Sequence, residues 1–310
     1  MLSIIIQNDF GVGNMVSWSS KQTLYPLQTQ WGEESPYNAV AEQFSGYRYL
    51  MGTPTVALSQ IMAYYKYPKY CSTEIKELAT TKFTSLKNWD GVYNWSNMTK
   101  NVHIEDCDEQ SQLMIGTLLY QNRTNLYENI LDSDDKVSIG KVWNVLKENG
   151  FYVDPIKDYN FDDVENSISE KNLVLVSGND SNEQKVTTTK HGWWIFSYTD
   201  TTIENNYSGQ AFWIIDAIRQ KKRQNTYYIF WIPFRHTQVM NFVHCNFGRG
   251  GDGNGWYDSG VFNMRKVMTD EEVKTKGVTS ETTTSTRDKD NYAFRLKMIC
   301  EISPNGGTKI

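Results

Sequence analysis

Cysteine and histidine are the side chains best suited to nucleophilic and metal chemistry, and the 310-residue chain has four of each. The cysteines, Cys71, Cys107, Cys245 and Cys300, lie far apart in the sequence. They form no Cys-x-x-Cys motif, and no cysteine and histidine stand at the spacing of zinc ligands. The sequence therefore predicts no structural metal, no disulfide framework and no cofactor.

The segment His244-Cys245-Asn246 places three functional residue types side by side in a stretch expected to be a strand. Adjacent side chains on a strand point to opposite faces of the sheet. Cys245 should therefore face away from His244 and Asn246, and we interpret it as a buried structural cysteine. His244 shares the face of Asn246 and is interpreted as a packed strand histidine.

The glycine-rich segment from Gly248 to Gly255 invites a phosphate or calcium interpretation. It lacks the Gly-Lys-Ser/Thr ending of a phosphate loop and does not open a helix. Asp252 and Asn254 offer oxygen ligands, but no repeat and no terminal glutamate supports a calcium loop. A tight turn after a strand is the favoured interpretation.

The elements that position these residues divide the chain into two halves. Helical spacing of apolar residues predicts a helix over 53–66, with Thr53 at the N-cap and Pro54 in the first turn. Two further helices are expected over 108–120 and 139–148. The second half predicts strands. These cover 173–176, 192–198, 211–218, 227–233, 240–246 and 293–302. The polar run 271–290 is expected to be an exposed, mobile loop, and the whole pattern favours the α+β class.

Composition narrows the range of partners. The chain is 39% hydrophobic, which allows a large core, and its formal charge is -5. Without a clear basic run it lacks the charge pattern of a nucleic-acid-binding protein. No stretch approaches the ~20 apolar residues of a membrane span, and the first residues lack the basic start of a signal peptide. We therefore expect neither nucleic acid nor membrane as a partner, and the oligomeric state stays open.

Five segments, in this order, resemble motifs of the streptopain-like cysteine peptidases, family C10 of the papain superfamily. They are 31–38 (WGEESPYN), 52–68 (GTPTVALSQIMAYYKYP), 93–98 (YNWSNM), 208–216 (SGQAFWIID, with one extra residue before Asp216) and 244–262 (HCNFGRGGDGNGWYDSGVF). The resemblance implies a papain-like two-lobed α+β fold over residues 25–302. A helical lobe would cover about 25–165 and an antiparallel β-sheet or barrel lobe about 166–302, between an N-terminal extension, 1–24, and a C-terminal tail, 303–310. It also implies a protein secreted or extracytoplasmic in a bacterium.

The family's site implies a role for each matching position. A papain-type site uses a cysteine at a helix N-terminus, a histidine base, an asparagine that orients the histidine, and a glutamine in the oxyanion hole. In this chain the nucleophile falls on Thr53, the base on Gln210 and the oxyanion-hole glutamine on Glu33. The orienting asparagine is kept as Asn246, while the tryptophan that shields it is replaced by Phe247.

These replacements remove the family's chemistry. A threonine hydroxyl is far less acidic than a thiol, and working threonine nucleophiles use their own chain-terminal amine, which the internal Thr53 lacks. The carboxamide of Gln210 does not take up and return a proton near neutral pH, and an ionised Glu33 would repel an oxyanion. The sequence thus predicts a pseudo-protease that binds a peptide or a protein partner in the retained cleft.

Alternatives remain open at the sequence level. His191 lies in a segment faintly similar to the family's base motif, and it would serve as base if the strands align differently. The chain would then still carry Thr53 as nucleophile. An active peptidase with a non-standard nucleophile or base is the second alternative, and a purely structural or adhesive module is the third. His103 and His236 lack a supporting motif and are expected at the surface.

Overall fold

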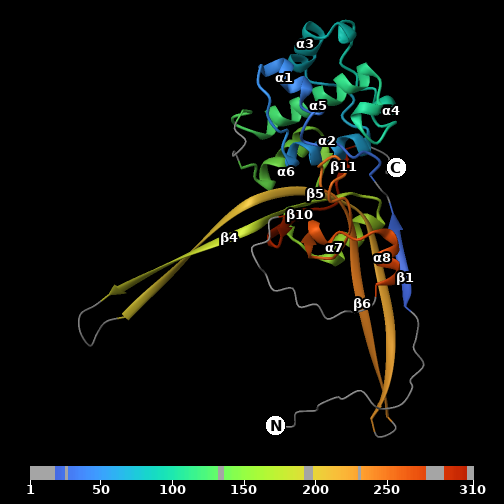
Figure 1. The fold of residues 1–310 in the computed structure, drawn as a ribbon, viewed down its shortest axis with the longest axis vertical. Coiled ribbons are helices and arrows are strands. Elements are labelled where there is room, and N and C mark those ends of the chain that lie inside the picture. The colour runs from blue at the N-terminus through green and yellow to red at the C-terminus, as the bar shows by residue number, and fades with distance from the viewer. Residues whose placement is uncertain are drawn as a thin grey trace.

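The computed structural model describes residues 18–24, 27–131, 136–191, 198–229, 232–276 and 290–305. Helices gather at one end of the molecule and an antiparallel sheet lies against them (Figure 1). Two long two-stranded arms leave the sheet in different directions. The predicted α+β class, with a helical lobe followed by an antiparallel β lobe, is confirmed.

The helical lobe is built from six α-helices. They are α1 (Ala39–Ser45), α2 (Thr53–Tyr65), α3 (Thr73–Lys82), α4 (Trp95–Met98), α5 (Glu109–Leu126) and α6 (Ile139–Glu148). Short 3-10 turns lie at Thr84–Leu86, Ile104–Asp106 and Met264–Lys266, and two more helices, α7 (Phe161–Ser169) and α8 (Asp270–Thr275), accompany the sheet. No helix among the described residues combines the length and apolarity needed to cross a membrane.

The three predicted helices are present as α2, α5 and α6. The bounds of α6 match the prediction, whereas α5 continues six residues past Tyr120. Its extension is polar in sequence yet buried, because Asn122 donates to Ser59 Oγ (2.8 Å) and Arg123 donates to the carbonyl oxygen of Met51 (3.1 Å). A hydrophobic pattern cannot reveal turns that are stabilised by such buried polar contacts.

The main sheet has the order β3-β10-β4-β5-β6-β7, and all its pairs are antiparallel. Its strands are β3 (Lys157–Asp158), β4 (Val174–His191), β5 (Tyr198–Ile229), β6 (Ile232–Asn246), β7 (Gly255–Asp258) and β10 (Phe294–Ile299). Strand β1 (Ser19–Leu24) pairs with β5 at 217–222, continuing the edge that β4 leaves at Ile215. Two small sheets pair β2 (Phe151–Tyr152) with β11 (Ser303–Pro304), and β8 (Phe262–Asn263) with β9 (Asn291–Tyr292).

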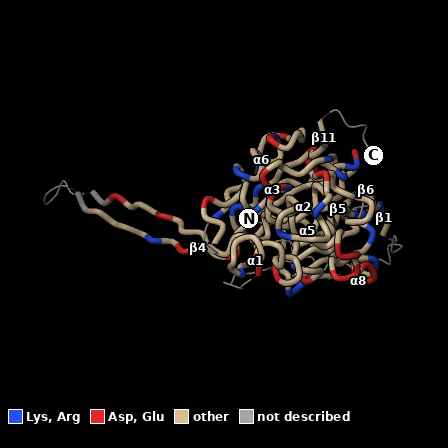
Figure 2. Tube along the Cα trace, turned by 90° about the horizontal axis from the view of Figure 1, so that it is seen from above, with Lys and Arg blue, Asp and Glu red and all other residues tan. Residues whose placement is uncertain are grey.

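The arms were not foreseen in the sequence. Predicted strands 173–176 and 211–218 are only the buried parts of β4 and β5, which run on as exposed ribbon. Figure 2 shows the β4–β5 arm projecting from the body with both acidic and basic residues along it. A ribbon exposed on both faces has no apolar period, so the pattern ends where burial ends. Residues 192–197 and 230–231 of two predicted strands lie outside the described residues.

The predicted loop 271–290 is wrong at its start. Residues 271–275 belong to α8, which has a capping box between Thr269 and Glu272 and buries Val273. The capping box satisfies the free N–H groups of the first turn, so this short polar segment forms a helix. Residues 277–289 lie outside the described part of the chain.

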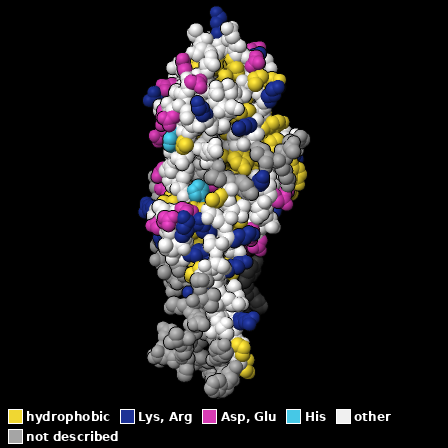
Figure 3. Space-filling view, turned by 90° about the vertical axis from the view of Figure 1, so that its right-hand side faces the viewer, with side chains coloured by type: hydrophobic (Ala, Val, Ile, Leu, Met, Phe, Trp, Pro, Cys, Tyr) yellow, Lys and Arg dark blue, Asp and Glu magenta, His cyan; other side chains and the backbone are white. Residues whose placement is uncertain are grey.

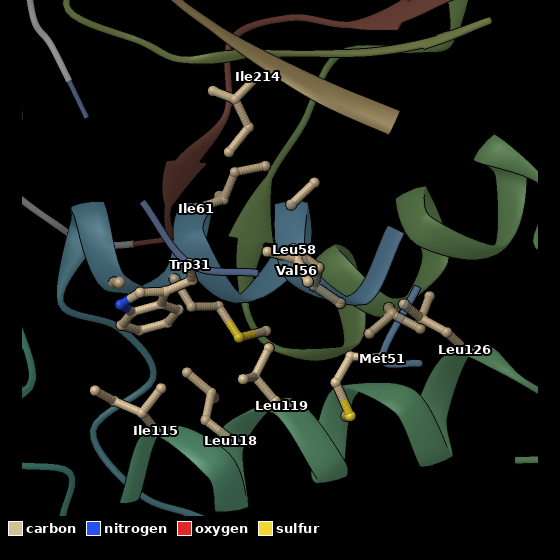
Figure 4. Packing of buried hydrophobic residues seen from close by; sticks show 14 of the residues in the cluster. Trp31, Met51, Val56, Leu58, Ile61, Ile115, Leu118, Leu119, Leu126 and Ile214 are labelled. Carbon is tan, nitrogen blue, oxygen red and sulfur yellow. The ribbon is translucent and has the colours of Figure 1, made fainter. Parts of the chain in front are cut away.

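Alternation along β5 separates two cores. Phe212 and Ile214 pack with the helical lobe, whereas Trp213 and Ile215 pack on the opposite face of the sheet. Figure 4 shows α2 between β5 and α5, with Ile61 pointing toward Ile214. The helix that begins at Thr53 is thus enclosed on both sides.

Replacing Leu58 of α2 by alanine should lower the free energy of unfolding by about 2–5 kcal/mol, because its side chain is fully buried and leaves a cavity. Leu50→Ala is the control, since that leucine is 48% exposed. Urea titrations of both variants measure the difference, and equal losses would contradict the packing described for α2.

Candidate active site

The start of α2 is built by glycine and by contacts from α5. Gly52 has φ +79°, and a side chain there would collide with the hydroxyl of Tyr127. The guanidinium of Arg123 donates to the Met51 carbonyl oxygen (3.1 Å) and lies 4.0 Å over the Tyr127 ring. These contacts hold the backbone at the point where the helix begins.

Thr53 is the first residue of α2, not its capping side chain as predicted. Its hydroxyl oxygen instead accepts the backbone N–H of Phe212 on β5 (3.0 Å), and the residue is only 6% exposed. The hydroxyl therefore joins the helical lobe to the sheet.

Gln210 lies two residues before this contact. It is exposed, pairs with Asn179 of β4, and shares by alternation the face of β5 that carries Phe212. The structure therefore brings Gln210 and Thr53, far apart in the sequence, to the same junction of helix and strand.

Asn246 ends β6, and its carboxamide is fully engaged away from Gln210. Its Oδ1 accepts from Gln60 Nε2 (3.1 Å) and from the N–H of Gly248 (3.0 Å), while Nδ2 donates to the Thr29 carbonyl oxygen (2.9 Å). The retained asparagine thus binds α2 and the segment that precedes Trp31.

Gln60 is the central residue that sequence reasoning missed. Its Oε1 accepts from the Thr29 hydroxyl (3.1 Å) and from the Trp31 N–H (3.1 Å), and its side chain is fully buried. It lies within the family-like segment 52–68, but only the fold shows that it contacts Asn246. The sequence contains one sign of this hydrogen-bonding role, a glutamine within an otherwise apolar stretch of helix, because such a residue needs polar partners when the helix is buried.

The backbone of Glu33 is hydrogen-bonded to Met51, which lies two residues before the start of α2. Its carbonyl oxygen accepts the N–H of Met51 (2.9 Å). Burial raises the pKa of the Glu33 carboxyl, and the charge of Arg249 and a hydrogen bond from the Thr53 backbone oppose this shift. The carboxyl therefore lies close to the backbone at the start of α2.

Arg249 comes from the glycine-rich turn and is a second residue that sequence reasoning missed. The N–H of Gly250 donates to the Trp31 carbonyl oxygen (3.1 Å), which places the turn beside Glu33. Arg249 Nε lies 3.8 Å from Glu33 Oε1, and its other nitrogens bind Asp290 Oδ1 (3.0 Å) and Tyr292 Oη (2.7 Å). A cation therefore faces the carboxyl across the site.

The turn itself is held by its own residues. The N–H of Phe247 donates to Asn254 Oδ1 (2.9 Å), so this amide closes the turn. Gly248, Gly250 and Gly253 have positive φ angles, as a tight turn requires. Within the described ranges, no group of three or more His, Cys, Asp or Glu side chains is arranged to hold a metal ion.

Phe247 is fully buried in the sheet's outer core. Its ring stacks on Trp213 (5.2 Å between centroids) and on Tyr292 (5.8 Å). The aromatic ring at the tryptophan position therefore supports the strand end behind Asn246.

His191 lies far from this junction along the strand. The register pairs Gln210 with Asn179 and His191 with Tyr198, so His191 is 12 residues beyond Asn179 on β4. At about 3.3 Å per residue this is about 40 Å of extended strand. The geometry gives no support to His191 as an alternative base. His236, on the β5–β6 arm, is exposed, and His103 is partly buried.

The cysteines lack the features of reactive thiols. The Cys71 thiol donates to Gln121 Oε1 (3.1 Å), and burial raises its pKa to about 11. Burial also raises the pKa of Cys107 and Cys245, and that of Cys300 to about 12. A reactive cysteine shows the opposite shift. Cys245 is fully buried on β6, as the predicted alternation requires.

His244 faces Asp216. Its Nδ1 lies 2.6 Å from Asp216 Oδ1, and Asp216 Oδ2 accepts the Leu27 N–H (2.7 Å). The β5–β6 register shifts between Ile215 and Ala217, so the extra residue noted before Asp216 coincides with a β-bulge. Burial alone would lower the pKa of His244, but the hydrogen bond and charge of Asp216 outweigh it and the pKa is raised.

Comparisons with known proteins point to one peptidase family. Residues 31–257 match the model of the Peptidase C10 family. Active wild-type interpain A, a cysteine protease of Prevotella intermedia, is 13% identical with a TM-score of 0.49, covering 90% of this chain and 94% of that one. A mutant prointerpain A fragment from the same organism is 14% identical with a TM-score of 0.44, covering 90% and 71%. No curated protein sequence matches the chain.

Replacing Gln60 by leucine should lower the free energy of unfolding by at least about 2 kcal/mol. The Trp31 N–H and the Thr29 hydroxyl would lose their partner, and each buried unsatisfied group costs about 1–3 kcal/mol. Gln28→Leu, at an exposed position, is the matched control. Chemical denaturation compares the two, and a neutral Gln60→Leu would show that the junction does not depend on this amide.

Stability should depend on pH through His244. A histidine whose folded pKa lies above its ordinary value of 6.5 stabilises the fold fully below that value, and the contribution disappears as pH rises through the folded pKa. The free energy of unfolding should therefore fall as pH rises above 6.5 in the native chain, and fall less in His244→Gln. His236→Gln serves as control, and identical pH profiles for all three proteins would refute the expectation.

Proposed function

The chain belongs to the Peptidase C10 family, and we propose that it is a non-catalytic member that binds peptide at the junction of α2 and β5. One observation carries this proposal: the Thr53 hydroxyl, which stands at the nucleophile position, is engaged by the chain's own backbone, since its oxygen accepts the Phe212 N–H. This contact joins the helical lobe to the sheet, and it occupies one of the two lone pairs of the oxygen that would have to attack a substrate.

The nucleophile position supports the proposal through its chemistry. The Thr53 hydroxyl is hydrogen-bonded to the Phe212 N–H, and the residue at the family's base position, Gln210, is an amide. Activation of a hydroxyl requires a base within hydrogen-bond reach that takes and returns the proton. A carboxamide cannot do this near neutral pH.

The oxyanion position adds an electrostatic argument. An ionised Glu33 beside the Thr53 N–H places negative charge where negative charge would develop in a peptidase. Arg249 lies at 3.8 Å from that carboxyl and compensates it. The family's glutamine donor is also absent here, and loss of one oxyanion donor costs about 10²–10³ in rate. The added negative charge and the missing donor both oppose catalysis.

Binding is supported by what stays accessible around these groups. Gln210 is exposed, and the side chains of Glu33 and Arg249 keep 18% and 29% of their surface. A partly exposed carboxyl and guanidinium can hydrogen-bond a peptide backbone or a charged side chain, and an extended peptide fits beside exposed strands. A peptide is therefore the ligand class that this surface suits best.

The first test asks whether the chain cleaves protein. Incubation of the wild-type chain and of Thr53→Ala with fluorescein-labelled casein should release no peptide in either case. Thr53→Cys with Gln210→His should gain labelling by iodoacetamide at residue 53 over Thr53→Cys alone, because an imidazole beside a helix N-terminus lowers the pKa of a thiol. Turnover by the wild-type chain that Thr53→Ala abolishes would overturn the proposal in favour of an active hydrolase.

The second test asks where peptide binds. Gln210→Trp should weaken binding of labelled casein in fluorescence anisotropy, whereas Gln184→Trp, on an exposed part of β4, should not. Wild-type binding that Gln210→Trp leaves unchanged would place the ligand elsewhere. A chain that binds no casein at all would favour a structural or adhesive module.

A further inference from the structure

The β5–β6 arm extends beyond every strand that flanks it. Seven cross-strand pairs, from Arg223↔Gln238 to Ile229↔Ile232, make a ribbon about 20 Å long. The flanking strands stop short of it, since β1 reaches only Lys222 and β7 pairs with β6 only at 242–245. In Figure 1 the arm runs past β1 and away from the body.

The base of the arm is held by polar contacts. The Arg223 guanidinium donates twice to Gln238 Oε1 (3.2 and 2.7 Å), and Asn225 Nδ2 donates to the same oxygen (3.3 Å). Arg223 also lies 4.8 Å from the ring of Trp18. Polar side-chain contacts, rather than an apolar core, therefore stabilise the base of the arm.

The arm is basic in an acidic protein. Residues 222–238 contain Lys222, Arg223 and Arg235 and no Asp or Glu, whereas the whole chain carries a formal charge of -5. Lys222, Arg235 and His236 are exposed. Figure 3 shows Lys and Arg side chains over the lower part of the molecule, where this arm leaves the body.

The outer end of the arm is apolar. Ile232 is 59% and Phe234 49% exposed, and their spacing of two residues places them on one face of the ribbon. In the sequence, 227–234 is an unbroken run of uncharged residues. Apolar side chains exposed together at the end of a projecting ribbon mark an interaction site.

We propose that this arm binds the interface of an anionic lipid membrane. Aromatic and aliphatic side chains at the end would enter the headgroup boundary, where aromatic residues are favoured. Arg235 lies three residues from Ile232, about 10 Å along the strand, and would meet anionic headgroups there. A strand needs about 9–11 residues to cross a bilayer, so this short apolar end suits shallow insertion.

The charge pattern favours lipid over a second copy of the chain. Pairing of two such arms would bring Lys222, Arg223 and Arg235 of one copy against the same residues of the other, and like charges on strand edges oppose pairing. The expectation of no membrane partner rested on the lack of a span and of a clear basic run. The basic residues flank the apolar run in the sequence, and only the hairpin gathers them on one arm.

Co-sedimentation of the full chain with lipid vesicles tests the proposal. The chain should pellet with vesicles of phosphatidylcholine and phosphatidylglycerol in equal parts, remain in solution with phosphatidylcholine alone, and be released at high ionic strength. Ile232→Asp with Phe234→Asp should weaken binding at least about tenfold, because both apolar groups are lost and negative charge is added. Lys222→Gln with Arg235→Gln should weaken it as well.

The matched control is Val186→Asp with Ile203→Asp on the β4–β5 arm, where both residues are similarly exposed (59% and 55%) and the change in charge is the same. This variant should bind like the wild-type chain, and circular dichroism confirms that each variant stays folded. No binding of wild type to the anionic vesicles, or equal loss in the control, would overturn the proposal. Light scattering that shows a dimer dissolved by the Ile232 and Phe234 changes would assign the end to a second copy instead.

Discussion

The hydrogen bonds of one buried amide, Gln60, connect the parts on which the candidate site depends. It sits inside α2 and binds the chain before Trp31 on one side and Asn246 at the end of β6 on the other. A buried amide is costly unless satisfied, so these partners are fixed in position once the helix packs. The positions of these partners in turn fix where α2 starts, where β6 ends and where the glycine-rich turn that carries Arg249 lies.

The same junction that positions reactive groups in a cysteine peptidase positions stabilising contacts here. The Thr53 hydroxyl oxygen accepts the Phe212 N–H, and Arg249 lies 3.8 Å from the Glu33 carboxyl and offsets its charge. The first contact satisfies a buried backbone N–H and the second offsets the charge of a partly exposed carboxyl, and both favour the fold. The proposed role in ligand recognition follows from this arrangement, because covalent chemistry needs a nucleophile with a base within hydrogen-bond reach.

The arms show how far a sheet can extend when its core no longer supports it. Within the body, β5 alternates between two cores, and outside it the same strand continues as ribbon held by backbone pairing and polar side chains. The two arms differ in chemistry, because the β4–β5 arm mixes charges while the β5–β6 arm is basic with an apolar end. Their different composition makes different roles physically reasonable for the two.

Local patterns in the chain were enough to establish the α+β class, the helix at Thr53 and the family motifs, and the resemblance to the family assigned residues to the nucleophile, base and oxyanion positions. These depend on apolar periodicity and on residue type, which the linear chain carries. Folding was needed to show that Asn246 binds Gln60, that Arg249 faces Glu33, that His191 lies far along β4, and that the basic and apolar residues of 222–235 share one arm. Such pairings join residues up to 186 positions apart, and their register is set by packing and strand pairing, which no local pattern encodes.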